Sequence, residues 1–432
     1  MKRYTLVGLG MVAGFGLAMG VMSAHGANDN SAYSQLNLFS DAFERVRANY
    51  VRPVQDSELI NAAIQGMVSS LDPHSSYMDT KSYGDMQITT KGQFGGVGIE
   101  VQEDDGLIKV ISPIDGTPAA KAGIKPGDHI AGIDGTSIAG LPLNDAIDKM
   151  RGPEGSKITL TIIRTSEKKP FDVTLQRAIV SVDATSSRRE GDVAYIRLPG
   201  FNEQTAQGLE KAVRDLKKQM GPNLRGYVLD LRNNPGGLLD QAIQVSDDFL
   251  NGGEIVSTRG RHPEDTQRYD AKAGDITDGK PVVVLINAGT ASASEIVSGA
   301  LQDHKRATVI GMTSFGKGSV QTIIPLGEGG GALRLTTARY FTPSGHSIQA
   351  QGIIPDIAVA QGDEADVPKI FRTSEADMPG HLIGEPVAKK ANAPIITPAP
   401  GKKYDDFQLS YALDLLRGKM TVAAVQKNAS AQ

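Results

Sequence analysis

Residues 281–303 read PVVVLINAGTASASEIVSGALQD, which contains an apolar run, a polar turn and a segment of good helix propensity in direct succession. The apolar run, residues 282–286, is typical of a strand buried on both faces. The sequence NAGT favours a turn, and the residues after it favour a helix. A serine at such a corner has its hydroxyl beside backbone N–H groups that lack a helical partner. Ser292 and Ser294 are therefore both candidate nucleophiles, although serine is also a common helix cap.

The same alternation extends over residues 178–360. The apolar strand candidates VAYIRL, GYVLDLR, PVVVLIN and ATVIGM are separated by helix candidates at residues 209–220, 238–250 and 293–303. Strands that alternate with helices predict an α/β core with largely buried strands. Catalytic residues in such folds lie where strands end and helices begin.

A lysine follows the last of these strand candidates. Lys317 lies in TSFGKGSVQTIIPL between two glycines, where it lacks the usual solvated setting. A desolvated lysine loses its proton more easily and can act as a base near neutral pH. The residues after it alternate like a strand, so Lys317, Ser319 and Gln321 share one face and Gln321 can orient the lysine amine. A surface lysine in a glycine turn is the alternative.

The segment GYVLDLRNNPGG ends a strand candidate in a polar, glycine-rich turn. Its last two residues, Gly236 and Gly237, bring backbone N–H groups to the strand end. With the N–H of Ala293 they can form an oxyanion hole, in which each donor is worth on the order of 10²–10³ in rate. A tight strand-to-helix connection needs the same glycines, and the two roles are compatible.

Residues 1–26 have the features of an export signal. Lys2 and Arg3 precede an apolar run, and small residues suited to cleavage follow it. An uncleaved membrane anchor is the alternative, because the apolar run is long. The chain has no cysteine, which excludes disulfides, thiolate catalysis, cysteine metal sites and a lipid anchor on cysteine.

Helical spacing over residues 33–86 predicts a short N-terminal helical domain. Residues 87–177 change to short β-branched runs broken by glycine, with two short helical stretches between them. Residues 361–432 are rich in alanine and proline and are expected to form a linker and a helical extension that contains FQLSYALDLLRG.

The order of GGVGIEVQ, TPAAKAGIKPGDHIAGIDG and LPLNDAIDKMRG within residues 87–177 resembles a PDZ domain. In such domains the N–H groups of a glycine loop bind a terminal carboxylate, and the peptide adds as a strand to the sheet edge. A glycine turn that serves only the barrel is the alternative. The residues that the resemblance assigns to peptide binding are Gly96, Val97, Gly98 and Ile99.

The segments LDPHSSYM, GGVGIEV, DLRNNPGG, GTASASEI, FGKGSVQ and TARYFTPSGHSIQAQGIIPDI together resemble the C-terminal processing, or tail-specific, peptidases. These are serine proteases with a PDZ domain, and the resemblance extends over nearly the whole exported chain. It implies a ClpP/crotonase-like α/β catalytic core with an inserted PDZ domain and an N-terminal helical domain.

The resemblance also implies roles for single residues. Ser292 corresponds to the nucleophile, Lys317 to the general base and Gln321 to the residue that supports it. The oxyanion donors correspond to Gly236 or Gly237 and to Ala293. Arg151, which follows the last helix candidate of the PDZ region, is a candidate for coupling peptide binding to the active site.

Partners and location follow partly from composition. A net charge of -4 and a pI near 6.0 provide no broad basic surface for nucleic acid. The resemblance implies exported protein substrates with apolar C-terminal tails, no cofactor, a homo-oligomer and, in some relatives, an adaptor protein. An acidic, cysteine-free exported chain fits a Gram-negative periplasm. A non-catalytic, tail-binding scaffold is the main alternative function.

Other chemistries fit the sequence less well. A Ser-His-Asp protease needs a catalytic histidine, but no histidine lies in a recognisable signature, and His74 in LDPHSSYM is expected to be a packed turn residue. Ser314 and Lys317 satisfy S-x-x-K, but the accompanying S-D-N and K-T-G patterns are missing. GMTSFGKG lacks the serine or threonine that completes a P-loop. No spacing of histidines and carboxylates suggests a metal site.

Overall fold

The computed structural model describes residues 29–104, 106–114, 116–181, 184–327, 329–362, 374–385, 395–399, 402 and 404–419. The chain forms two compact units, the first ending at Ser70 and the second beginning at Leu71. The predicted signal at residues 1–26, and the membrane anchor that is its alternative, lie outside the described residues. Within the described ranges no helix is both long enough and apolar enough to cross a membrane.

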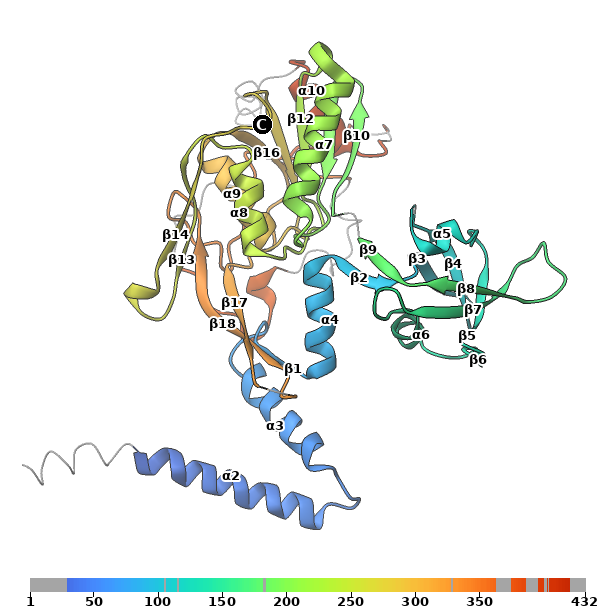
Figure 1. Cartoon of the computed structure of the whole chain (residues 1–432). Coiled ribbons are helices and arrows are strands. Elements are labelled where there is room, and N and C mark those ends of the chain that lie inside the picture. Colours follow the sequence, from blue (N-terminus) through green and yellow to red (C-terminus); the bar gives the residue numbers. More distant parts are fainter. Residues whose placement is uncertain are drawn as a thin grey trace, which may run out of the picture. The chain divides into compact units, whose positions relative to one another are not determined.

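The described part of the first unit contains the helices α2 (Asp29–Asn49) and α3 (Asp56–Ser69), drawn in blue in Figure 1. Two acidic residues in the first turn of α3, Asp56 and Glu58, lie where the helix dipole favours negative charge. Large apolar side chains of α2, including Leu36 and Phe39, are exposed. Both helices fall in or overlap the range predicted to be helical, residues 33–86, but residues 76–78 of that range form a strand.

The central sheet of the α/β core has six strands in the order β10-β11-β12-β15-β16-β19. Neighbours from β11 to β19 are parallel, and β10 is antiparallel to β11. All residues of β12 and β15 are buried, as expected for parallel strands covered on both faces. The strands are β10 (Ser186–Glu190), β11 (Val193–Arg197), β12 (Gly226–Asp230), β15 (Val282–Ile286), β16 (Ala307–Gly311) and β19 (Ile357–Ala358).

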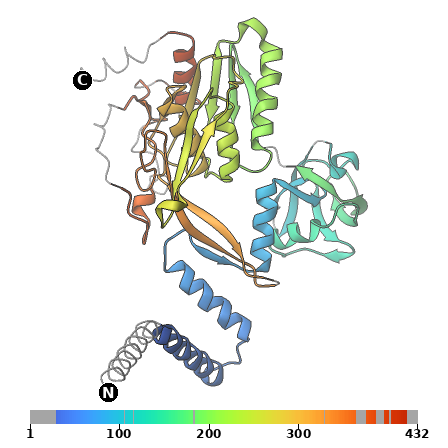
Figure 2. The ribbon, with the colours of Figure 1, turned by 60° about the vertical axis from the view of Figure 1, so that its left-hand side comes forward.

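Helices cover both faces of this sheet. Three of them, α7 (Thr205–Met220), α8 (Leu239–Asp247) and α9 (Ala293–Asp303), share one apolar cluster with strand residues such as Leu229. The fourth, α10 (Phe407–Leu416), packs with residues of the opposite strand face, such as Val228. Figure 2 shows the red α10 and the green α7 on opposite sides of the sheet. The predicted α/β alternation and the terminal helix are confirmed.

A second sheet of the core contains β1, β18, β13 and β14 in that order, with β17 also paired to β18. The strand β17 begins two residues after Lys317 and carries Gln321. The register of β17 and β18 shifts between Val320 and Gln321. The strands are β1 (Ser76–Met78), β13 (Gly253–Arg259), β14 (Gln267–Ala271), β17 (Ser319–Pro325) and β18 (Ala332–Phe341).

The region that resembles a PDZ domain forms its own sheet in the order β3-β4-β5-β7-β8, with β6 paired to β5. The chain enters this region through β2 (Gln93–Gly96) and leaves through β9 (Ala178–Ser181), and these two strands pair with each other. Its other elements are β3 (Ile99–Asp104), β4 (Leu107–Pro113), α5 (Pro118–Lys121), β5 (His129–Ile133), β6 (Thr136–Ser137), α6 (Leu143–Met150), β7 (Lys157–Ile163) and β8 (Phe171–Gln176). The helix α4 (Thr80–Lys91) precedes β2.

One part of the expected linker, residues 374–385, packs against the core. It contains a short 3₁₀ turn, Glu375–Asp377, and the Glu375 side chain is buried. The Glu375 N–H donates to the carbonyl oxygen of Phe315 at 2.9 Å. This segment therefore contacts the loop that carries Lys317.

Candidate active site

Ser292 lies at the corner between β15 and α9. It is buried and has φ 57° and ψ -115°, a conformation that is costly for a residue with a Cβ atom. The preceding turn is fixed by Thr290, whose Oγ1 donates to the Leu231 carbonyl oxygen at 2.8 Å. Asn287 Oδ1 accepts from the N–H groups of Gly289 and Asn233 at 3.0 and 2.9 Å. The turns after β15 and β12 therefore hold each other in place.

Ser294, the other serine candidate, is fully buried, and its hydroxyl is engaged. Its Oγ lies 2.8 Å from the Asn234 carbonyl oxygen and 2.7 Å from the Ala291 carbonyl oxygen. It also accepts from the Ala291 N–H at 3.1 Å. Ser294 therefore stabilises the corner, whereas Ser292 has no comparable set of side-chain bonds among the described residues.

Glu295 joins the serine corner to the lysine loop. Its Oε2 accepts from the N–H groups of Ser292 and Lys317 at 2.7 and 2.9 Å. Its Oε1 accepts from the Gly316 N–H at 2.7 Å and from Ser314 Oγ at 2.6 Å. Burial raises the pKa of this carboxyl to about 7, and its four donors act in the opposite direction. One carboxylate oxygen thus holds the main chains of both predicted catalytic residues.

Glu295 is absent from the predicted site residues, although a sequence signal for it exists. It lies three residues after Ser292, the spacing of a capping box, in which the glutamate accepts from the N–H of the capping residue. Ser314, rejected as a nucleophile, donates its hydroxyl to Glu295 and accepts from the Ile353 N–H at 2.6 Å. Its hydroxyl therefore links the Glu295 carboxylate to the main chain at Ile353.

Lys317 is partly buried, and its loop has no room for a side chain at the next residue, Gly318. A Cβ atom on Gly318 would collide with the backbone of Gln349. Burial and then the Arg334 guanidinium lower the pKa of Lys317, and the carboxylates of Glu375, Glu295 and Asp72 oppose that shift. The net direction favours the neutral amine that a general base requires.

Gln321 Nε2 donates to Ser319 Oγ at 2.9 Å, so two of the three residues predicted to share one face are in contact. The same nitrogen lies 3.2 Å from Thr336 Oγ1. Among the described side chains no hydrogen bond joins Gln321 to Lys317, or Lys317 Nζ to Ser292 Oγ. Catalytic hydrogen bonds are often long before substrate binds.

The NNPGG turn lies directly against the serine corner. A Cβ atom on Gly236, which has φ 98°, would lie 2.8 Å from Ser292 Cβ and 2.9 Å from the Ala293 nitrogen. The Gly236 N–H itself donates to Asn234 Oδ1 at 2.8 Å. The N–H groups of Gly237 and Ala293 donate to no other described residue. These two groups are thus the ones available to an oxyanion.

The glycine loop of the PDZ region precedes the edge strand β3. Its carbonyl groups are fixed, because Val97 O accepts from Ala119 N at 2.9 Å and Gly98 O accepts from Ile114 N at 3.0 Å. The N–H groups of Val97 and Gly98 donate to no other described residue. Gly96 ends β2 and Ile99 begins β3. The loop therefore presents donors beside an open strand edge.

Arg151 follows α6 and contacts two other elements. Its Nη1 lies 3.7 Å from Asp85 Oδ1 on α4, and its guanidinium carbon lies 5.3 Å from the centre of the Phe94 ring. A second ion pair, between Lys81 and Asp148 at 2.7 Å, also joins α4 to α6. These contacts connect the last PDZ helix with α4, and none of them involves a catalytic candidate.

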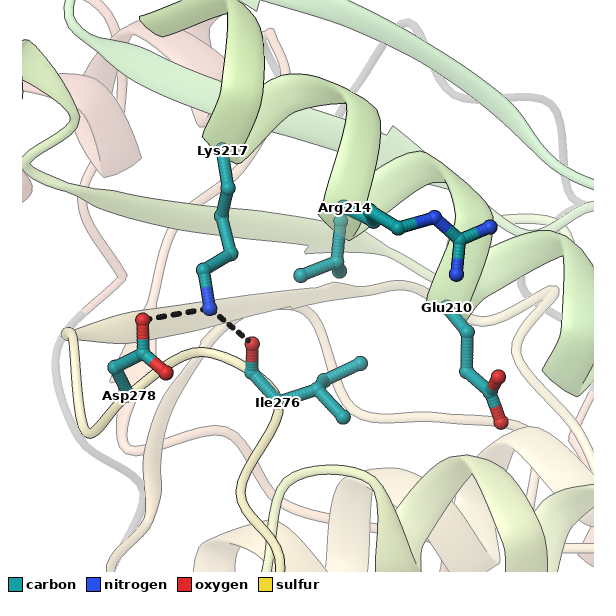
Figure 3. A pocket seen from close by; sticks show the side chains of 6 residues that line it. Glu210, Arg214, Lys217, Ile276 and Asp278 are labelled. Carbon is teal, nitrogen blue, oxygen red and sulfur yellow. Dashed lines mark hydrogen bonds and ion pairs between the residues drawn. The ribbon is translucent and has the colours of Figure 1, made fainter. Parts of the chain in front are cut away.

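A separate hollow of about 350 Å³ lies beside α7, and Figure 3 shows its lining. Lys217 reaches to Asp278 Oδ2 at 2.6 Å and to the Ile276 carbonyl oxygen at 3.1 Å. Glu210 and Arg214 also line it. The hollow contains no catalytic candidate.

In the described ranges no group of three or more histidines and carboxylates is arranged to hold a metal ion.

Three family models match the chain. Peptidase family S41 matches residues 192–359, a PDZ domain matches residues 85–163, and the activating protease CtpB N-terminal domain matches residues 17–82.

Individual relatives match most of its length. A carboxy-terminal-processing protease of Bartonella bacilliformis is 55% identical over 92% of this chain and 92% of its own length. The carboxy-terminal processing protease CtpA of Bacillus subtilis is 36% identical over 78% of this chain and 71% of its own. The solved structure of a photosystem II D1 C-terminal processing protease is 30% identical, covers 76% of this chain and 87% of its own, and has a TM-score of 0.42. On its sequence and domain content the chain belongs to the carboxy-terminal processing proteases of peptidase family S41, and it is a serine peptidase with a PDZ domain.

Proposed function

We propose that the chain is an endopeptidase in which Ser292 attacks the peptide carbonyl carbon and Lys317 is the general base. The observation that carries this assignment is Glu295, whose Oε2 accepts from the main-chain N–H groups of both residues. The two motifs are 25 residues apart in the sequence, yet one buried atom fixes both. The lowered pKa of Lys317 supports the same assignment.

The reaction divides into two steps. The Ser292 Oγ–H proton passes to neutral Lys317 as the new C–O bond forms, and the lysine then gives a proton to the leaving amine. Water, deprotonated in the same way, releases the acyl group. The N–H groups of Gly237 and Ala293 stabilise the oxyanion, and Gly236 allows its turn to approach the serine. Gln321 would orient Lys317 after its amide turns away from Ser319.

Substrates would be selected by their C-terminal tails. The free N–H groups of Val97 and Gly98 fit a terminal carboxylate, and the open edge of β3 fits an added strand. Partly buried apolar residues beside that edge, Ile99, Val101 and Ile147, fit an apolar tail. Arg151 would communicate occupancy of this site through α4.

The cellular setting is part of the proposal. Residues 1–26 would direct export to a periplasm, with an uncleaved anchor as the alternative. The exposed apolar side chains of α2 fit assembly into a homo-oligomer, and an adaptor protein would regulate activity. A non-catalytic tail-binding protein is the second candidate, and the lack of described hydrogen bonds from the Lys317 amine to Ser292 Oγ and to Gln321 favours it.

The test is cleavage of an unstructured protein that ends in an apolar tail. The mature chain should cut it, whereas Ser292→Ala and Lys317→Ala should not, although both fold. Amidation of the substrate's C-terminus should raise KM, because the glycine loop loses its anion. Normal cleavage by Lys317→Ala would refute the assigned base, and equal KM for the free and amidated tails would refute tail selection.

A further inference from the structure

The turn at residues 72–75 and the segment at residues 374–377 lie far apart in the sequence but meet beside the lysine loop. His74 Nε2 lies 2.8 Å from Glu375 Oε2 across 301 positions of sequence. The Glu375 side chain is 1% exposed and that of His74 is 14% exposed. Neither residue has a part in the proposed reaction, so this buried pair needs another explanation.

Glu375 is bonded to both sides of Lys317. Its N–H donates to the Phe315 carbonyl oxygen at 2.9 Å, two residues before the lysine. Its Oε1 accepts from Gln349 Nε2 at 2.9 Å, and Gln349 Oε1 accepts from the Gly318 N–H at 3.1 Å, one residue after the lysine. Glu375 thus holds the lysine loop at two points, directly through its main-chain N–H and through Gln349 by its carboxylate.

The same turn also reaches the strand after the lysine. Asp72 Oδ1 accepts from Thr336 Oγ1 at 3.1 Å, and Thr336 Oγ1 lies 3.2 Å from Gln321 Nε2. Asp72 is buried and is further held by Ser75 Oγ at 2.7 Å. The turn therefore flanks Lys317 on two sides, through Glu375 on one and through Thr336 on the other.

We propose that Glu375 is a positioning residue for Lys317, which fixes the lysine loop and sets the charge that the amine faces. This proposal rests on the proposed function, since it presumes that Lys317 is the base. The other charged groups that face Lys317 are Arg334 from β18, Glu295 from α9 and Asp72 from the turn before β1. The negative charge of Glu375 offsets the effect of the Arg334 guanidinium on the pKa of Lys317. The lysine therefore stays a strong enough base to accept the serine proton.

Glu375→Gln tests the charge and keeps the shape. The glutamine oxygen can accept from Gln349, and its amide can donate to His74 once the histidine carries its proton on Nδ1. Removal of the carboxylate should lower the pKa of Lys317 further, because an opposing negative charge is lost. In a plot of kcat/KM against pH, the rise on the acid side, called the acid limb, should then move to lower pH. Each unit of that movement corresponds to about a tenfold higher rate on the limb.

Two further variants separate charge from structural damage. Arg334→Gln should move the acid limb in the opposite direction, to higher pH, because the guanidinium lowers the pKa of Lys317. Asp377→Asn removes a carboxylate from the same 3₁₀ turn, but that side chain is exposed and accepts from Ser374, so the limb should stay in place. Structural damage to the loop would lower the maximal kcat/KM of both variants, but it would not move their acid limbs in opposite directions.

The profiles are measured with the full mature chain and an unstructured substrate, and folding of each variant is checked by thermal unfolding. Opposite shifts for Glu375→Gln and Arg334→Gln support the proposal. An unchanged acid limb in folded Glu375→Gln overturns it, even when Ser292→Ala and Lys317→Ala are inactive. If Glu375→Gln does not fold, an unchanged limb in Arg334→Gln overturns it instead. Full activity of Lys317→Ala would refute the proposed function itself.

Discussion

The terminal helix α10 should support the NNPGG turn through Arg232. This arginine directly precedes the turn and is buried. Its Nη1 and Nη2 donate to the two carboxylate oxygens of Asp406 at 2.9 and 2.6 Å, and its Nη2 also donates to Asp230 at 2.6 Å. Asp406 in turn caps α10, because its Oδ1 accepts from the Leu409 N–H at 2.9 Å. One carboxylate therefore ties α10 to the segment that ends β12.

Asp406→Ala removes two contributions to the free energy of unfolding. Loss of the cap costs about 1 kcal/mol. Loss of hydrogen bonding to a charged partner costs about 1.5–3 kcal/mol, since Arg232 keeps Asp230. The sum is about 2.5–4 kcal/mol. Asp406→Asn keeps a good cap and should cost about 1 kcal/mol less than the alanine variant.

Urea unfolding in a Ser292→Ala background, which prevents self-cleavage, measures these differences. Cleavage by the corresponding active variants should fall by more than the unfolded fraction explains, because the oxyanion turn loses its support. Equal unfolding midpoints for Asp406→Ala and the parent would refute a stabilising contact between Asp406 and Arg232. Equal losses in the alanine and asparagine variants would refute the role of the cap.

Three further outcomes follow from the site and its surroundings. Gly236→Ala should lower kcat by about 10²-fold, because its Cβ would press on the serine corner, whereas Gly279→Ala has a similar positive φ, meets no neighbour and should retain activity. Equal losses in these two variants would show that backbone strain alone is responsible. Glu295→Gln should lower kcat more than it raises KM, because glutamine can accept from only two of the four donors; unchanged steady-state kinetics would contradict this. Burial and nearby Glu210 and Asp247 raise the pKa of Asp248 to about 8, well above its value in the unfolded chain, and its Oδ2 has no partner among the described residues. Its contribution to stability is therefore complete at acid pH and is lost as the pH rises from about 4 to 8. Unfolding curves for Asp248→Asn should match the wild type near pH 3, below the pKa of Asp248 in the unfolded chain, and show greater stability at pH 9. A difference that does not grow with pH would contradict the assignment.

Local patterns in the sequence predict the elements that carry the site. The continuous apolar run of β15 and the helix propensity after it place a strand and a helix on either side of Ser292. The pattern leaves Ser292 and Ser294 equivalent, because both are serines at the same corner. Only the positions of the Asn234 and Ala291 carbonyl groups distinguish them, and these depend on how two turns meet in space.

Contacts between distant segments account for what the sequence does not reveal. Glu375 lies in a stretch whose alanine and proline content predicts a linker, and its partners His74 and Gln349 belong to other parts of the chain. No periodicity encodes such a pairing. The side-chain direction of Gln321 is likewise not encoded in a local pattern, because Ser319 and Thr336 compete with Lys317 for its amide.

Covalent labelling shows whether Ser292 is a nucleophile that Lys317 activates. The mature protein is treated with a fluorophosphonate, and the adduct is located by peptide mass spectrometry. A single adduct on Ser292, absent in Ser292→Ala and formed much more slowly in folded Lys317→Ala, is the predicted result. An adduct on Ser294 or Ser314, or an unchanged labelling rate in Lys317→Ala, would contradict the assignment.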